Sequence, residues 1–424
     1  MRLIVHCLSH WSYKSIPPKE KPTYTADAVT VIIPTIHNQF ENLKGPLQSI
    51  LACHPSKLIL VTTYNKSEAL RNLVKTLKNS SETVIQVLHV DKANKRLQIS
   101  RALEGDHVKT PITVMADDDV EWPVTLMPWL LAPFEDDEMG GVGTCQRVKR
   151  VEGGAVARLY NWLGAAYIER RNFEISATHN IDGGTSCMSG RTGAYRTEIL
   201  TSHEFLKGFT NEKWGKHTLN ADDDNFVTRW LVSHQWRTWV QYNPECEVET
   251  TLETGLRFLY QCSRWARSNW RSNWTSLVHE RIYTCVHLTR CDSSQLTHAN
   301  SRQPWCTYAL HLATFTSLAF VIDPLLLFSC WWATAELKPS TRYAILWAEI
   351  IFMFCFTKVV KLVGLFRRNP SDIIYLPVSV AFGYFHGLVK LYALFTLKKV
   401  GQSVTLVSKL TNQSLDILGQ PRRW

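Results

Sequence analysis

The sequence predicts an α/β fold, a mostly parallel sheet with helices on both faces, followed by an apolar C-terminal region. Short apolar runs of strand length alternate with helix-like stretches through the first third of the chain, which is typical of parallel sheets. Apolar residues concentrate again after Gln303, although only 45% of the 424 residues are hydrophobic. The chain therefore has room for one large domain and a membrane region.

Four apolar runs are expected to form the first strands, with three helices between them. The strands are predicted at 29–35, 57–63, 83–90 and 112–115, and the helices at 39–52, 67–77 and 93–104. Open α/β sheets bind ligands at the carboxyl ends of their strands. We therefore expect the functional residues where these runs end.

Three carboxylates, Asp117, Asp118 and Asp119, follow directly after the fourth strand. Adjacent carboxylates repel one another, and a divalent cation that carries a diphosphate would neutralise them. In an extended chain Asp117 and Asp119 point the same way. The alternative is a solvated acidic loop, which is the commoner role of such runs.

The chain then continues with a further strand, several helices and a glycine-dense stretch. We predict a short helix at 123–133, a strand at 141–148, a long amphipathic helix at 155–172, a helix at 226–233 and a strand at 235–241. Residues 181–196 contain four glycines, which let a ligand approach the backbone closely or form ordinary turns.

A second acidic run, Asp222 to Asp224, precedes the helix at 226–233. Aspartate at a helix start caps the free N–H groups and suits the helix dipole, so capping competes with catalysis as the role of Asp222 and Asp224. Three acids in succession exceed what capping needs. This run is therefore a second candidate functional segment.

Residues 255–274 have the pattern of a basic amphipathic helix. Trp270 and Trp274 stand one helical turn apart, and arginines recur at three- or four-residue steps. This pattern is typical of a helix at a membrane surface, and a soluble surface helix is the alternative.

Three apolar stretches, 305–332, 343–366 and 373–397, are each long enough to cross a bilayer. Polar residues within them are expected to face a bundle interior or a pathway; they are Asp323, Lys358, Lys361, His386 and Lys390. Basic residues after both the second and the third stretch mark both sides as cytoplasmic, so a re-entrant stretch is an alternative to three spans.

The net charge and the cysteine content limit the kinds of ligand and the cellular environment that suit this protein. The net charge of +10 suits a phosphate-bearing ligand or an anionic lipid bilayer, and no dense basic block with interleaved aromatics indicates nucleic acid. The eleven cysteines include no C-x-x-C pair, so neither a disulfide framework nor a zinc site is indicated. A cytosolic main domain fits this usage.

Several of these motifs, in this order, resemble those of processive membrane glycosyltransferases of family 2, which include the cellulose, chitin and hyaluronan synthases. The motifs are the strand ending Pro34-Thr35, the acids Asp117 to Asp119, the pair Asp222-Asp223 and Gln261-x-x-Arg264-Trp265, followed by membrane helices. Among the members, the chain looks closest to fungal hyaluronan synthase-like polysaccharide synthases.

The resemblance implies a GT-A type fold and inverting, metal-dependent transfer from a UDP-sugar donor to a growing polysaccharide, with passage of this glycan acceptor through the membrane region. It implies Mg2+ or Mn2+ at Asp117 and Asp119, with Asp117 also holding the nucleotide, and Asp223 as general base. It implies nucleotide or substrate binding by Pro34, Thr35, Lys95, Arg96, Gln261, Arg264 and Trp265. The resemblance also implies an integral membrane protein that lies at the plasma membrane and has its catalytic domain in the cytosol.

Two features depart from the family pattern. Relatives usually have an aspartate at the end of the second strand, where this chain has Thr62 and Thr63, and they commonly begin with a membrane helix, which is not visible before Ala28. Two alternatives therefore remain: single transfer to a lipid, as in ceramide glucosyltransferase, and an inactive membrane scaffold.

The predicted organisation has five parts. They are a lead-in segment (1–28), a cytosolic GT-A glycosyltransferase domain (29–253), an interface helix with a linker (254–303), a transmembrane region of about three helices (304–398) and a polar tail (399–424).

Overall fold

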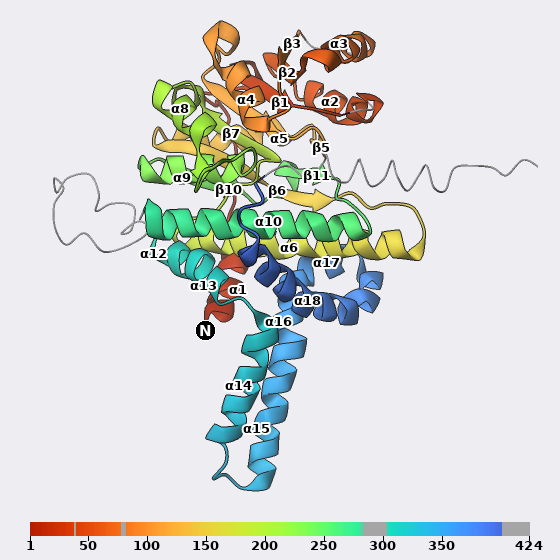
Figure 1. Ribbon diagram of the computed structural model, residues 1–424, viewed down its shortest axis with the longest axis vertical. Helices are drawn as coiled ribbons and strands as arrows, with labels where there is room; N and C mark the ends of the chain where they lie inside the picture. Colours follow the sequence, from red (N-terminus) through yellow and green to blue (C-terminus); the bar gives the residue numbers. More distant parts are fainter. Residues whose placement is uncertain (38–39, 78–81, 281, 283–302, 401–424) are drawn as a thin grey trace, which may run out of the picture.

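The computed structural model describes residues 1–37, 40–77, 82–280, 282 and 303–400. Most of the predicted linker before residue 303 and nearly all of the predicted polar tail lie outside the described residues. Among the described residues the chain forms a layered α/β head, two long helices below it and a projecting helical hairpin (Figure 1).

A mixed sheet forms the centre of the head. Its strands run in the order β3-β2-β1-β4-β7-β6-β11-β5, and β10 also pairs with β6. Their bounds are β1 (Val29–Pro34), β2 (Lys57–Thr63), β3 (Val84–Val90), β4 (Ile112–Ala116), β5 (Val120–Glu121), β6 (Met139–Val148), β7 (Thr192–Arg196), β10 (Arg237–Gln241) and β11 (Glu247–Thr250). Five of the eight strand pairings in this sheet are parallel. A separate small ribbon joins β8 (Lys213–Trp214) and β9 (His217–Thr218).

The middle of the sheet contains a strand that the sequence analysis did not predict. The glycine-dense stretch ends in β7, which lies antiparallel between β4 and β6. A Cβ on Gly193 would meet the Tyr195 hydroxyl at 2.5 Å, so one of these glycines serves strand packing as well as ligand access. The strand escaped prediction because Gly193 and the three glycines that precede it in this stretch have low strand propensity.

Helices cover both faces of the sheet, as predicted. On one face, α2 (Lys44–Leu51), α3 (Ser67–Thr76) and α5 (Leu126–Leu131) pack on inward side chains such as Val31 and Leu60. On the other face, α4 (Lys95–Leu103), α8 (His203–Asn211) and α9 (Asp223–Ser233) pack on Ile32 and Ile59, after the short α7 (Thr197–Leu200). Successive β1 residues alternate between the two cores, because strand side chains alternate in direction.

Two long helices lie below the head (Figure 1). α6 (Ala155–Asp182) continues ten residues beyond the predicted end at 172 and stops at Gly183, whose φ of 71° is left-handed. α10 (Leu256–Trp274) forms where the interface helix was predicted. It packs through Phe258 and Cys262 on α6 and the C-terminal helices, so its apolar face is covered by protein. α1 (Arg2–Ser12), within the predicted lead-in segment, packs against α6.

The C-terminal region differs from a bundle of three straight spans, which the structure does not confirm. Judged by length and composition, one helix among the described residues could cross a membrane, Pro370–Phe395, and a pair bent by 95°, Pro304–Phe315 and Ala319–Ala333, could make a second. The second predicted stretch is interrupted by π and 3-10 turns between residues 352 and 362.

Short helices and a hairpin make up this region. Their bounds are α12 (Pro304–Cys306), α13 (Ala313–Phe315), α14 (Ala319–Ala333), α15 (Pro339–Ile351), α16 (Thr357–Val359), α17 (Val363–Arg368) and α18 (Leu376–Phe395). α14 and α15 project side by side from the rest of the molecule, whereas α18 lies against α10 (Figure 1).

Candidate active site

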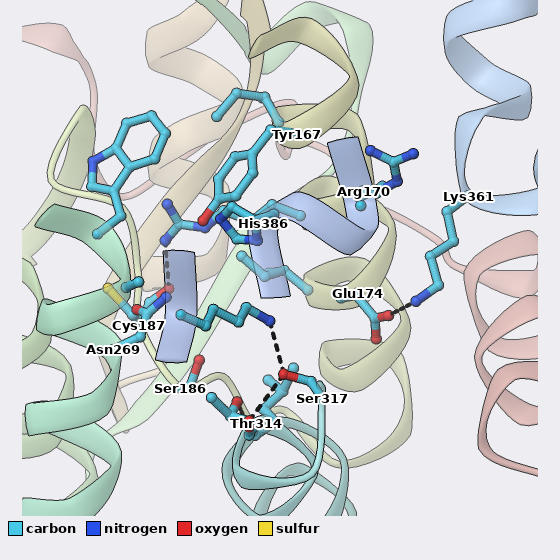
Figure 2. A pocket seen from close by; sticks show the side chains of 18 of the residues that line it. Tyr167, Arg170, Glu174, Ser186, Cys187, Asn269, Thr314, Ser317, Lys361 and His386 are labelled. Atoms are coloured by element: carbon cyan, nitrogen blue, oxygen red, sulfur yellow. Dashed lines mark hydrogen bonds and ion pairs between the residues drawn. The ribbon is translucent and has the colours of Figure 1, made fainter. Parts of the chain in front are cut away.

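A cavity of about 980 Å³ extends from the ends of the sheet strands, between α6 and α10, toward the C-terminal helices (Figure 2). Both acidic runs and the 261–265 motif line it. The structure thus brings Asp119, Asp223 and Arg264, which are far apart in the sequence, to the walls of one cavity.

The loop after β4 presents its three carboxylates to this cavity. Thr35 Oγ1 donates a hydrogen bond of 2.5 Å to Asp118 Oδ2, and the hydroxyls of Thr250 and Thr251 each donate to Asp119 Oδ2 at 3.2 Å. Burial, and then repulsion from Asp117, raise the pKa of Asp119 to about 6. The loop therefore holds more negative charge than its protein neighbours neutralise.

Lys95, at the start of α4, links the two acidic runs. Its Nζ lies 2.7 Å from Asp117 Oδ1 and 2.8 Å from Asp223 Oδ2. Burial disfavours the charged amine, but the attraction of these two carboxylates outweighs burial and raises the pKa of Lys95 above its ordinary value. A charged Lys95 therefore fixes the spacing between the loop and the start of α9.

The second acidic run divides into three different roles. Asp222 pairs with Arg271 of α10 at 2.6 Å and makes no capping hydrogen bond through its side chain. Burial opposes ionisation of Asp223, but the charge of Lys95 prevails and lowers its pKa. Burial, followed by repulsion from Asp223, raises the pKa of Asp224 instead. Asp224 lines the cavity and accepts a hydrogen bond from the Gly190 backbone N–H at 3.3 Å.

The first half of α10 supplies the third wall. Gln261, Arg264 and Trp265 all line the cavity. Trp265 stacks on Tyr167 of α6 with ring centroids 5.1 Å apart. Arg264 has no hydrogen-bond or ion-pair partner within the part of the chain that the structure describes. Its guanidinium is therefore available to an anionic ligand.

Two of the predicted nucleotide-binding residues lie behind the wall. Pro34 ends β1 and Thr35 follows it; both are buried, and neither lines the cavity. Thr35 reaches the site through its hydrogen bond to Asp118. Thr62, at the position where relatives usually have an aspartate, also lies behind the wall. It is buried, and its hydroxyl has no partner among the described residues.

Arg96 differs from its predicted role beside the nucleotide. Its side chain is 1% exposed, does not line the cavity, and donates hydrogen bonds to the backbone carbonyls of Phe209, Ala221 and Asp222. It also pairs with Glu212 at 2.6 Å. All these partners are protein groups, so Arg96 braces the segment that leads into Asp223.

The sequence analysis missed Tyr167 and Arg170, which line the inner part of the cavity, whereas it expected His386 and Lys390 to face a bundle interior or a pathway. Tyr167 and Arg170 come from α6, and His386 and Lys390 come from α18 (Figure 2). His386 and Lys390 line an interior cavity, as expected for polar residues within an apolar stretch. That these two residues lie close to α6 is a result of tertiary packing, which no pattern in the sequence indicates.

The carboxylates at the sheet edge fit a divalent cation. No group of three or more His, Cys, Asp or Glu side chains that could hold a metal occurs among residues 1–37, 40–77, 82–280, 282 and 303–400. Mg2+ is commonly held by only one or two carboxylates together with substrate phosphates. Asp117 and Asp119, with the raised pKa of Asp119, suit such sharing.

A GT-A-like α/β sheet with paired acids and an arginine–tryptophan motif around one cavity defines a glycosyltransferase. The chain belongs to the family described as "Glycosyltransferase like family 2", whose profile matches residues 26–268. It acts, as this family does, with a nucleotide-sugar donor.

Several proteins of known name are similar to this chain. A type 2 glycosyltransferase of Gibberella zeae is 66% identical over 93% of this chain and 72% of its own length. Human hyaluronan synthase 2 is 30% identical over 32% of this chain and 24% of its own, so the predicted likeness to hyaluronan synthases is weak. A mannosyltransferase of Pyrobaculum calidifontis, solved with GDP-Man and Mn2+, is 18% identical, with a TM-score of 0.44 over 84% of this chain and 96% of that one.

Proposed function

We propose that this enzyme transfers a sugar from a UDP-sugar to an acceptor hydroxyl with inversion, using Mg2+ or Mn2+. The observation that supports this most is the meeting of Asp119, Asp223 and Arg264 in one cavity. When bound between Asp117, Asp119 and the diphosphate, the cation would offset charge on the leaving group.

The residues of the chain supply the remaining steps. The acceptor oxygen attacks the anomeric carbon, its proton passes to a carboxylate, and the bond from that carbon to the UDP oxygen breaks. Arg264 offsets charge that develops on the departing diphosphate, and Trp265 offers a flat face for a sugar ring. Direct displacement inverts the anomeric centre.

Asp223 is the proposed general base, and Asp224 is the second candidate for that role. The ion pair with Lys95 lowers the pKa of Asp223 and so weakens it as a proton acceptor. Asp224 lines the same cavity, and burial raises its pKa, which favours proton uptake. Replacing Asp223 and Asp224 one at a time by asparagine, and measuring the rate of sugar transfer, would show which of them is the general base.

Two classes of acceptor are chemically compatible with this reaction, a growing polysaccharide and a lipid. Polysaccharide extension with passage of the chain needs several spans around a polar path. The described residues contain one or two candidate spans, and the α14–α15 hairpin projects alone with exposed side chains such as Phe328, Trp332 and Trp347. These features favour an acceptor held in the lipid bilayer, and they support membrane attachment through the hairpin.

The product distinguishes the two classes. Membranes containing the full chain would be incubated with radiolabelled UDP-sugars and Mg2+ or Mn2+, with EDTA as the control for metal dependence. We expect a labelled product that extracts into organic solvent. A product retained by size separation and absent from the organic phase would instead establish polysaccharide extension.

A further inference from the structure

Arg191 lies directly before β7, and the reaction proposed above assigns it no role. Its side chain lines the cavity although it is only 8% exposed. Burial of a charged side chain is costly unless neighbouring groups compensate for the lost water. The contacts of Arg191 are therefore informative, and they reach three parts of the candidate active site.

The backbone of Arg191 holds the start of the first acidic run. Its carbonyl oxygen accepts a hydrogen bond of 3.0 Å from the Asp117 backbone N–H. The next residue, Thr192, pairs with Ala116 in the antiparallel register of β7 and β4. Arg191 therefore extends this pairing by one residue, to the point where the loop of three carboxylates begins.

The guanidinium group of Arg191 reaches the third acid of this run through Thr250. Arg191 Nε donates to Thr250 Oγ1 at 3.1 Å, and the Thr250 hydroxyl donates to Asp119 Oδ2 at 3.2 Å. Because an arginine can only donate, the hydroxyl proton of Thr250 stays available to Asp119. Arg191 Nη1 also donates to Gln146 Oε1 at 2.9 Å. These two bonds anchor the guanidinium group to the side of the cavity that holds Asp119.

The same guanidinium group lies against the tryptophan of the 261–265 motif. Arg191 Cζ is 5.5 Å from the centroid of the Trp265 ring, within the range of a cation–π contact. Tyr167 stacks on Trp265 as well, with ring centroids 5.1 Å apart. Trp265 is only partly buried and lines the cavity. Two contacts therefore fix its orientation, and one of them comes from the residue that is anchored beside Asp119.

Arginine is the residue type that these contacts require. Burial lowers the pKa of the Arg191 guanidinium group, and attraction from the Asp119 carboxylate is the strongest influence that opposes burial. A planar guanidinium group can donate in fixed directions and lie against an aromatic ring at the same time. A lysine ammonium group is a point charge without such a plane, so it would reproduce the charge of Arg191 but not its geometry.

We propose that Arg191 is a positioning residue that holds Trp265 in a fixed place relative to the metal-binding acids, so that acceptor and donor meet in the geometry of transfer. It is anchored at Thr250, acts on Trp265 and does not contact the substrate. This role rests on the function proposed above, in which Trp265 offers its face to a sugar ring. The network of contacts between Arg191, Thr250 and Trp265 does not depend on that function.

Steady-state kinetics of Arg191→Met test the proposal. Membranes containing the full chain would be assayed for labelled product at varied concentrations of the UDP-sugar from which the wild type releases UDP. We expect kcat to fall about 10- to 100-fold, because a small misplacement of a reacting group has effects of that order. KM for the UDP-sugar, and the affinity for UDP measured by calorimetry with Mn2+, should stay as in the wild type. A loss of UDP affinity of about tenfold would overturn the proposal, since Arg191 would then bind the diphosphate directly.

Two further variants separate positioning from charge and from folding. Arg191→Lys keeps the charge, but it should recover little of kcat because it lacks the planar group. Arg196→Met is the matched control, since Arg196 ends the same strand, is also 8% exposed and does not line the cavity. It should lower the melting temperature and leave kcat of the folded protein unchanged. Normal kcat in Arg191→Met, or full recovery in Arg191→Lys, would overturn the proposal.

A double-variant comparison with Trp265→Leu tests the route of the effect. If Arg191 acts on Trp265, Arg191→Met should reduce kcat much less in the Trp265→Leu background than in the wild type, and the losses in melting temperature should also be non-additive. The melting temperatures need no activity, which keeps the two proposals apart. No UDP release by the wild type, with non-additive melting temperatures, would contradict the proposed function and support the contact network. Normal UDP release with additive losses would do the reverse.

Discussion

Lys95 Nζ lies 2.8 Å from Asp223 Oδ2, and this contact joins the nucleotide side of the site to the start of α9. The same ammonium group reaches Asp117 at 2.7 Å. One cation therefore sets the distance between two carboxylates that the sequence separates by more than a hundred residues. It also keeps the proposed base ionised.

Replacement of Lys95 by methionine is expected to destabilise the protein by about 2 kcal/mol, because two partly buried carboxylates lose their counter-ion. Thermal unfolding of the full chain measures this. Lys95→Arg, which keeps the charge, should recover most of the stability. Equal melting temperatures for the methionine variant and the wild type would show that the pairs contribute nothing.

Asp223→Asn should lower the rate of sugar transfer by about 10²- to 10⁴-fold, the usual contribution of a general base. UDP release and labelled product report the rate, and binding of UDP is the control for an intact site. If Asp224→Asn has the larger effect and Asp223→Asn a small one, the base is Asp224 and Asp223 serves to position Lys95.

Arg264→Gln should weaken binding of UDP about tenfold, because Arg264 lines the cavity and has no partner among the described residues. Calorimetry in the presence of Mn2+ measures the affinity. Arg257→Gln is the matched control, since Arg257 is exposed on the same helix and does not line the cavity. Equal losses in both variants would indicate a general charge effect.

Arg96→Met should affect stability more than donor affinity. The buried guanidinium bonds to three backbone carbonyls and to Glu212, which would all lose a donor, so we expect a loss of about 3–5 kcal/mol. Thermal unfolding with and without UDP separates the effects. An unchanged melting temperature with weakened UDP binding would restore the role implied by the sequence resemblance.

The first four strands, and their succession along the chain, could be predicted from the sequence where apolar runs end sharply. β2 begins at Lys57 and ends at Thr63, as predicted, because Pro55 precedes it and the buried run stops at Tyr64. β7 could not be predicted, since Gly193 lies within it and three further glycines closely precede it. Alternation of Val31 and Ile32 between two cores follows directly from strand geometry.

For the candidate site, too, some features could be predicted from the sequence and others could not. The acids and the arginine–tryptophan motif stand out as short motifs, and the structure gathers them in one cavity. The roles of Arg96 and Arg271 could not be predicted, because a buried arginine that braces a loop looks the same in sequence as one that binds phosphate. Likewise, the apolar stretch 343–366 has the composition of a span, but turns interrupt it between residues 352 and 362.

His179 should make the protein less stable in acid. Burial lowers its pKa to about 4 from an ordinary 6.5. Its Nδ1 can donate to the Ile175 carbonyl, whereas Nε2 is buried without a partner among the described residues, so a second proton would find no acceptor. The unfolded chain binds that proton below pH 6.5, and the folded chain does so only near pH 4. The contribution of neutral His179 to the free energy of unfolding is therefore fully present above about pH 6.5, and it is lost as the pH drops toward 4.

His179→Phe should reduce this dependence, because the unfolded chain then has no proton to gain at this position. Thermal unfolding of the full chain between about pH 4.5 and 7.5 measures the slope, and the lowered pKa corresponds to at most about 3 kcal/mol over the window. His203→Phe is the control, since His203 is exposed on α8 and should leave the slope unchanged. The same slope in the His179 variant and the wild type would mean that other groups, such as the half-buried His10, govern the acid sensitivity.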